Sequence, residues 1–187
     1  MSTRLFPVIL FASLSCFLYG QNKYSYVYFN NLTEVEGTEY VIARMEEMGK
    51  MLKRNEQYLL FINTTNGDTN QADFHKGANI REIKQVKLEN RGINRIILLA
   101  QTIPSNEKKG MGWQDPVQLF VLSTDGKEKK QLTENHFFVQ TWTVCKETGK
   151  IVITGHYDAN MNGKYDKTDK HEILIYDLET FELTAKI

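Results

Sequence analysis

The feature that most constrains the fold of this 187-residue chain is a repeat in its C-terminal half. When the sequence is shifted by 54 residues, residues 97–100 fall on residues 151–154 and residues 118–122 fall on residues 172–176. All four runs are rich in apolar residues, and no gap is needed between the two matches. Each unit then has the pattern strand, long loop, strand, tight turn and strand. We therefore expect two β repeat units over residues 90–187 that pack side by side.

These units resemble the repeats of TolB-type, WD40-like β-propellers. The resemblance is carried by five short stretches, at residues 118–126, 131–133, 141–143, 149–153 and 173–178. It implies a blade-like antiparallel sheet, which in that family serves mostly for binding rather than for chemistry. Two units are fewer than the roughly four blades that a closed propeller needs. We therefore expect an incomplete propeller at most.

The N-terminal half, residues 21–89, has a different pattern. Aromatic and β-branched residues predict strands at 24–29 and 58–62. Between them, from Thr38 to Arg54, apolar residues recur at steps of three and four, which is typical of one face of a helix; they are Val41, Ile42, Met45, Met48, Met51 and Leu52. Strand, helix and strand in this order predict a βαβ-like unit with parallel pairing. For residues 78–89 both helix and strand stay open.

Together these patterns predict an α+β, β-rich fold. A single mature domain, residues 21–187, would begin with the βαβ-like unit and continue into antiparallel blade-like β hairpins. The alternative is an all-β incomplete propeller.

The first twenty residues are typical of a signal peptide. Arg4 is their only charge, and the fourteen uncharged residues 5–18 are too short to span a bilayer but fit the core of a secretory signal. Gly20 stands before polar residues, so cleavage after it is predicted. The protein is then expected to be exported, either periplasmic or extracellular.

A lipid-anchored envelope protein, held through Cys16, is the alternative address. Residues 13–15, Ser-Leu-Ser, fit a lipobox poorly, and the apolar run continues past Cys16. Removal of the leader would leave Cys145 as the remaining cysteine, so no internal disulfide is expected. No other apolar stretch approaches membrane length, so no membrane span is expected.

Residues 158–169 resemble the EF-hand calcium loop. Oxygen-bearing side chains stand at loop positions one, three, five, nine and twelve, and Gly163 stands at position six, where the backbone turns sharply. Position seven offers a backbone carbonyl, and Tyr165 at position eight is expected to point into the core. The predicted calcium ligands are Asp158, Asn160, Asn162, Lys164, Asp166 and Asp169.

This loop also departs from the EF-hand pattern. Position twelve is Asp169 rather than Glu, and Glu172 could substitute for it. The flanking segments look like strands, so the loop is expected inside a β hairpin. Only three of the side-chain ligands are carboxylates, which predicts weak affinity, on the order of 10⁻⁴–10⁻³ M. The alternative is a polar surface loop that binds no ion.

Other chemistry is sparse. Lys+Arg and Asp+Glu number 23 each, so the zero net charge argues against a nucleic-acid partner. His156 and His171 flank the loop and could approach each other, but a third zinc ligand is not evident. No nucleophile elbow or phosphate-binding glycine loop is present in the sequence. Catalytic residues therefore stay unknown, and Ca²⁺ is the one cofactor expected.

These observations favour an exported, calcium-binding, non-enzymatic binding or interaction module with a structural Ca²⁺ loop. Its partner, a protein or a glycan, is not identified by the sequence. The alternative function is a secreted hydrolase in which calcium braces a loop.

Overall fold

The computed structural model describes residues 29–45, 58–74, 77–104, 112, 114–163 and 165–187. The expected signal peptide at 1–20 and Cys16 lie outside these residues. The described part holds twelve strands and one short 3₁₀ turn, Glu89–Arg91. It contains no helix that is both long enough and apolar enough to cross a membrane.

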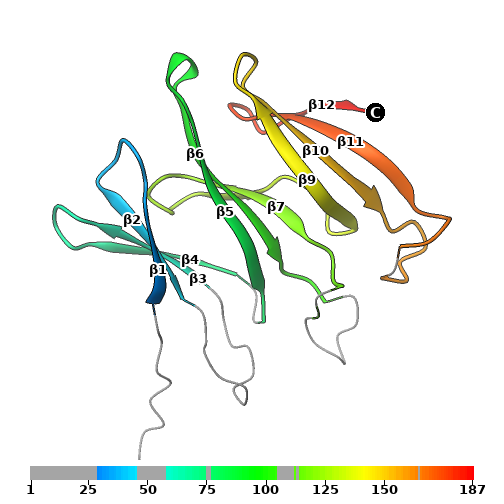
Figure 1. The fold of residues 1–187 in the computed structure, drawn as a ribbon, viewed down its shortest axis with the longest axis horizontal. Helices are drawn as coiled ribbons and strands as arrows, with labels where there is room; N and C mark the ends of the chain where they lie inside the picture. Colours follow the sequence, from blue (N-terminus) through cyan, green and yellow to red (C-terminus); the bar gives the residue numbers. More distant parts are fainter. Residues whose placement is uncertain (1–28, 46–57, 75–76, 105–111, 113, 164) are drawn as a thin grey trace, which may run out of the picture.

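The strands form three four-stranded antiparallel sheets that follow one another along the chain (Figure 1). The first sheet contains β1 (Phe29–Glu34), β2 (Tyr40–Met45), β3 (Tyr58–Asn63) and β4 (Thr69–Asp73). The second contains β5 (Asn79–Leu88), β6 (Ile93–Gln101), β7 (Gln118–Leu122) and β8 (Lys129–Gln131). The third contains β9 (Phe137–Cys145), β10 (Lys150–Tyr157), β11 (Lys170–Asp177) and β12 (Leu183–Lys186). Successive four-stranded sheets of this kind are the blades of a β-propeller, so the fold is propeller-like.

The predicted α+β class is therefore wrong, and the all-β alternative fits. Residues Tyr40–Met45 of the expected helix form strand β2, which pairs antiparallel with β1 and β3. The β-branched Val41 and Ile42 fit a strand as well as a helical face, and pairing on both sides decides the outcome. The expected parallel βαβ pairing is thus absent from this sheet, while residues 46–57 lie outside the description. The open segment 78–89 is mostly strand β5.

Two apolar layers between the sheets form the core. The layer between the first and second sheets includes Leu59, Phe61, Leu98 and Phe120, which are almost completely buried. The layer between the second and third sheets contains fifteen buried residues; its largest fully buried side chains are Ile97, Leu119, Phe137, Ile151, Ile153 and Leu174. The second sheet is therefore apolar on both faces, since Leu98 faces one neighbour and Ile97 the other.

The repeat is present, with a register difference of one residue. Leu98 pairs with Phe120 in the second sheet, and Ile153 pairs with Leu174 in the third; each pair faces the preceding sheet. Phe120 and Leu174 are 54 residues apart, which equals the shift of the sequence overlay. Leu98 and Ile153, however, are 55 residues apart. Because side chains alternate along a strand, the ungapped overlay matched residues of β6 and β10 that lie on opposite faces.

Candidate metal centre

Residues 158–169 join β10 to β11 at one end of the third sheet, in orange at the right of Figure 1. The last ladder pair before the loop is Tyr157 with Lys170. The predicted calcium loop therefore lies inside a β hairpin, as expected from its flanks.

Asp158 anchors the start of the loop. Its side chain is 7% exposed, and its two carboxylate oxygens accept hydrogen bonds from the backbone N–H groups of Asn162 at 3.1 Å and Gly163 at 2.6 Å. Gly163 has φ +71°, a conformation that glycine adopts without steric cost. The glycine at position six thus makes the sharp turn that the sequence pattern predicts.

Asp166 lies at the centre of the side-chain network. Its Oδ2 accepts hydrogen bonds from the amide groups of Asn160 at 2.8 Å and Asn162 at 2.7 Å. Its Oδ1 accepts from the hydroxyl of Thr168 at 2.6 Å and from the backbone N–H of the same residue at 2.8 Å. These hydrogen bonds, those from Thr168 first, hold the pKa of Asp166 well below its ordinary value because they favour the ionised form.

Asp169 ties the end of the loop to its start. Its carboxylate accepts hydrogen bonds from the backbone N–H groups of Ala159 at 3.1 Å and Asp166 at 2.7 Å. Hydrogen bonds thus connect five of the six predicted ligand residues within one loop, and the sixth, Lys164, lies outside the described residues. The suggested substitute ligand, Glu172, instead forms an ion pair with Lys186 at 2.6 Å.

The donor set suits a hard cation, because three carboxylates and two amides offer oxygen ligands. Each carboxylate oxygen of Asp158 and Asp169 accepts one hydrogen bond and keeps a second lone pair for a metal, whereas both oxygens of Asp166 already accept two. The amides of Asn160 and Asn162, however, now turn their nitrogens toward Asp166, so ligation requires these amides to rotate. In keeping with this, the described ranges hold no group of three or more His, Cys, Asp or Glu side chains arranged for a metal.

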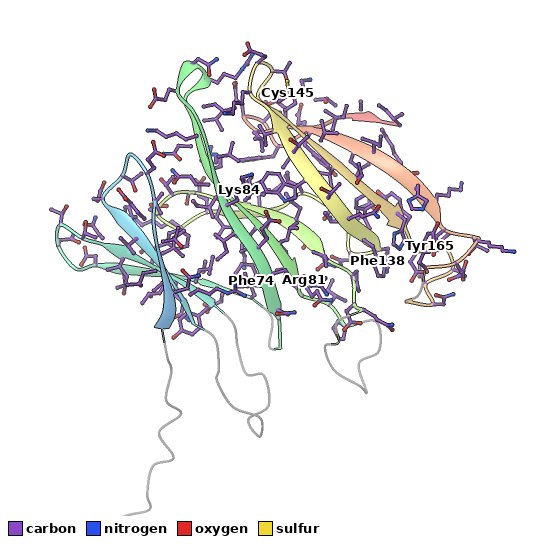
Figure 2. The ribbon with its side chains drawn as sticks, viewed as in Figure 1. Phe74, Arg81, Lys84, Phe138, Cys145 and Tyr165 are labelled. Carbon is purple, nitrogen blue, oxygen red and sulfur yellow. The ribbon has the colours of Figure 1, made fainter. Side chains whose placement is uncertain are left out.

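A groove of about 410 Å³ borders the loop, and the sequence did not predict it. Its rim includes Phe138, His156, Tyr165 and His171, which come from β9, β10, the loop and β11. Figure 2 labels Phe138 and Tyr165 at the same end of the third sheet. Tyr165 was expected to point into the core, but its side chain is 62% exposed. The pairing of His156 with His171 was the one sequence signal for this groove.

Two ring contacts and one hydrogen bond hold the histidines of this groove in place. His156 stacks on Phe138 with centroids 4.8 Å apart, and it lies 4.9 Å from the ring of Tyr165. The hydroxyl of Tyr165 is 2.7 Å from Nε2 of His171. Burial lowers the pKa of His156, and nearby His171 lowers it further, while the charges of Asp169 and Asp158 oppose the shift.

The comparison with known proteins finds solved structures of similar shape but no related sequence. No family model and no curated protein sequence matches the chain. The chain is similar to the β-propeller domain of the Trilobed protease from Pyrococcus furiosus, at 15% identity and TM-score 0.46, over 87% of this chain and 43% of that one. It is similar to the Pyrococcus horikoshii acylaminoacyl peptidase, at 9% identity and TM-score 0.46, over 87% of this chain and 25% of that one. A Synechocystis apocarotenoid oxygenase gives 12% identity and TM-score 0.40, over 86% and 38% of the two chains.

This chain therefore spans less than half the length of these solved chains. At such identities and TM-scores, the activities of the three proteins say nothing about the activity of this one.

Proposed function

We propose that this chain is an exported, calcium-binding interaction module in which residues 158–169 hold a structural Ca²⁺ ion. The observation that carries the proposal is the hydrogen-bonded closure of the loop around Gly163. Backbone N–H groups already orient the carboxylates of Asp158 and Asp169. The oxygen ligand types, their spacing and the turn at Gly163 support an EF-hand-like site in this loop.

The expected energetic role of the ion is to stabilise the folded hairpin. Three carboxylates in one loop repel one another, and an ordered loop of this length costs conformational entropy. A cation that binds only the folded form raises its stability by RT ln(1 + [L]/Kd), or about 1.4 kcal/mol at ten times Kd. With a Kd on the order of 10⁻⁴–10⁻³ M, this effect needs millimolar calcium, a concentration that suits an extracellular module.

The groove beside the loop is the surface that we assign to a protein or glycan partner. Phe138 and Tyr165 supply aromatic rings, which bind apolar or sugar faces, and Arg81 and Gln140 supply polar groups on the same rim. The TolB-type resemblance supports binding rather than catalysis and forms part of this proposal. The secreted hydrolase stays the alternative prediction.

The test is thermal unfolding of the purified protein in calcium-free buffer and at increasing calcium concentrations. We expect Tm to rise with calcium in the native protein, and the rise to be lost in Asp158→Ala and Asp166→Asn. Asp73→Asn removes an exposed carboxylate from strand β4 and should keep the full rise. An unchanged rise in both loop variants, or calorimetric titration of the native protein without calcium uptake, would contradict the assignment.

A further inference from the structure

His156 and His171 form a cross-strand pair next to the loop. They are direct partners in the antiparallel register of β10 and β11, so their side chains leave the same face of the sheet. Their ring centroids are 5.9 Å apart. Imidazole nitrogens lie about 2.0–2.1 Å from zinc, so the centroids of two ligating rings lie roughly 5–6 Å apart. The observed spacing therefore matches two imidazoles that share one metal ion.

One nitrogen of this pair lacks a partner. Nε2 of His156 is buried and has no hydrogen-bond partner among the described residues. A buried polar atom without a partner costs free energy, so its presence calls for an explanation. Stacking on Phe138 at 4.8 Å fixes the ring plane. A metal ion in the groove would supply the missing interaction.

Tyr165 completes the cluster with an oxygen atom. Its hydroxyl is 2.7 Å from Nε2 of His171, and its ring centroid is 5.2 Å from that of His171. Because this side chain comes from an exposed position of the loop, small rotations can move the hydroxyl between hydrogen bonding and ligation. Water can fill a remaining coordination position, because the groove is open.

We propose that His156 and His171, with Tyr165 as a weaker third ligand, bind a divalent transition-metal ion of the zinc type. The two nitrogens distinguish this site from the all-oxygen calcium loop, because imidazole suits zinc and copper whereas carboxylates and amides suit calcium. The assignment does not depend on calcium binding. If the assignment is correct, the groove beside the loop contains a transition-metal ion.

The test is calorimetric titration of the full chain with Zn²⁺ in calcium-free buffer. We expect one Zn²⁺ per chain, with at least about tenfold weaker binding in His156→Asn and in His171→Asn, because loss of even an outer-shell partner costs about 10–100-fold in metal affinity. Tyr165→Phe should weaken binding less. His136→Asn is the matched control, since His136 is exposed and the ring contacts of this cluster among the described residues do not involve it.

Two further measurements keep the test decisive. Proton NMR spectra with added Cu²⁺ should broaden the ring signals of His156 and His171 before those of His136. Unchanged Tm values without zinc should show that the variants are folded. The proposal is overturned if the native chain binds no Zn²⁺, if both histidine variants bind normally, or if Asp158→Ala alone abolishes binding, which would place the ion in the calcium loop.

Discussion

Gly126, in the turn between β7 and β8, lies directly against the ring of Phe61 in strand β3 of the first sheet. A β-carbon at position 126 would overlap ring atoms of Phe61, which is completely buried. The neighbouring carbonyl of Asp125 accepts a hydrogen bond from the amide of Asn70 at 3.0 Å. This turn therefore docks the second sheet onto the first, and the absence of a side chain sets how closely they approach.

Replacement of Gly126 by Ala should destabilise the protein. The glycine has φ +75°, which costs roughly 1–2 kcal/mol for a residue with a β-carbon. Overpacking against Phe61 adds about 1–3 kcal/mol. We expect the free energy of unfolding, measured in urea, to fall by roughly 2–5 kcal/mol.

Gly67→Ala is the matched control for the backbone contribution. Gly67 has φ +79°, and a β-carbon there would meet nothing within 4 Å. This variant should lose only the roughly 1–2 kcal/mol of backbone strain. Equal losses in the two variants would show that contact with Phe61 contributes nothing.

The sequence predicts correctly those strands whose own residues carry a local signal, such as a run of apolar side chains. Residues 119–122 form an unbroken apolar run, and they and Gln118 are all buried because a sheet covers each face. The helix expected near Val41 is wrong over Tyr40–Met45 because the β-branched Val41 and Ile42 also suit a strand, and pairing with both β1 and β3 decides the structure. Such non-local pairing leaves no local signature.

The same contrast, between a local sequence signal and non-local strand pairing, explains why the loop could be predicted and the groove could not. The predicted loop ligands lie within twelve residues, so spacing alone places Asp158 near Asp169. Phe138, His156 and His171 come from three strands, and they meet because the register pairs His156 with both of the others. A shift of one residue would turn His156 to the other face of the sheet. The sequence could suggest the proximity of the two histidines but not the groove.

The turn that holds Gly126 should also confer sensitivity to acid. Burial acts to raise the pKa of Asp125, but hydrogen bonds from the hydroxyl of Ser123 at 2.6 Å and from the backbone N–H of Lys127 at 3.1 Å outweigh it and lower the pKa. A carboxylate whose pKa is lower in the folded state adds stability above its unfolded pKa, near 4, and this stability is lost as pH falls through the folded value. Stability should therefore fall below about pH 4.

Asp125→Asn should lose less stability than the native protein over this acid range, as measured by urea unfolding at a series of pH values. Ser123→Ala removes one of the hydrogen bonds and should give an intermediate slope. Parallel pH profiles for the native protein and Asp125→Asn would show that another group is responsible.

Replacement of Phe137 tests how much the apolar layer between the second and third sheets stabilises the protein. It is completely buried and makes an edge contact with Tyr157 at 5.0 Å between centroids. Phe137→Ala should lower the free energy of unfolding by about 3–5 kcal/mol, because it removes apolar burial and leaves a cavity. Leu32→Ala, at a side chain 67% exposed, should change it by less than about 0.5 kcal/mol. A small loss for Phe137→Ala would contradict the assigned core.

The negative charge of the proposed calcium loop can be raised by Asn160→Asp. Asn160 donates hydrogen bonds to Asp166 at 2.8 Å and to the hydroxyl of Thr168 at 2.9 Å. A fourth carboxylate removes these bonds and adds repulsion, so Tm without calcium should fall. The same charge strengthens cation binding, so the calcium-induced rise in Tm should exceed the native one. Asn135→Asp, an exposed change outside the loop, should alter neither value, and a smaller calcium effect in Asn160→Asp would show that position 160 does not face the ion.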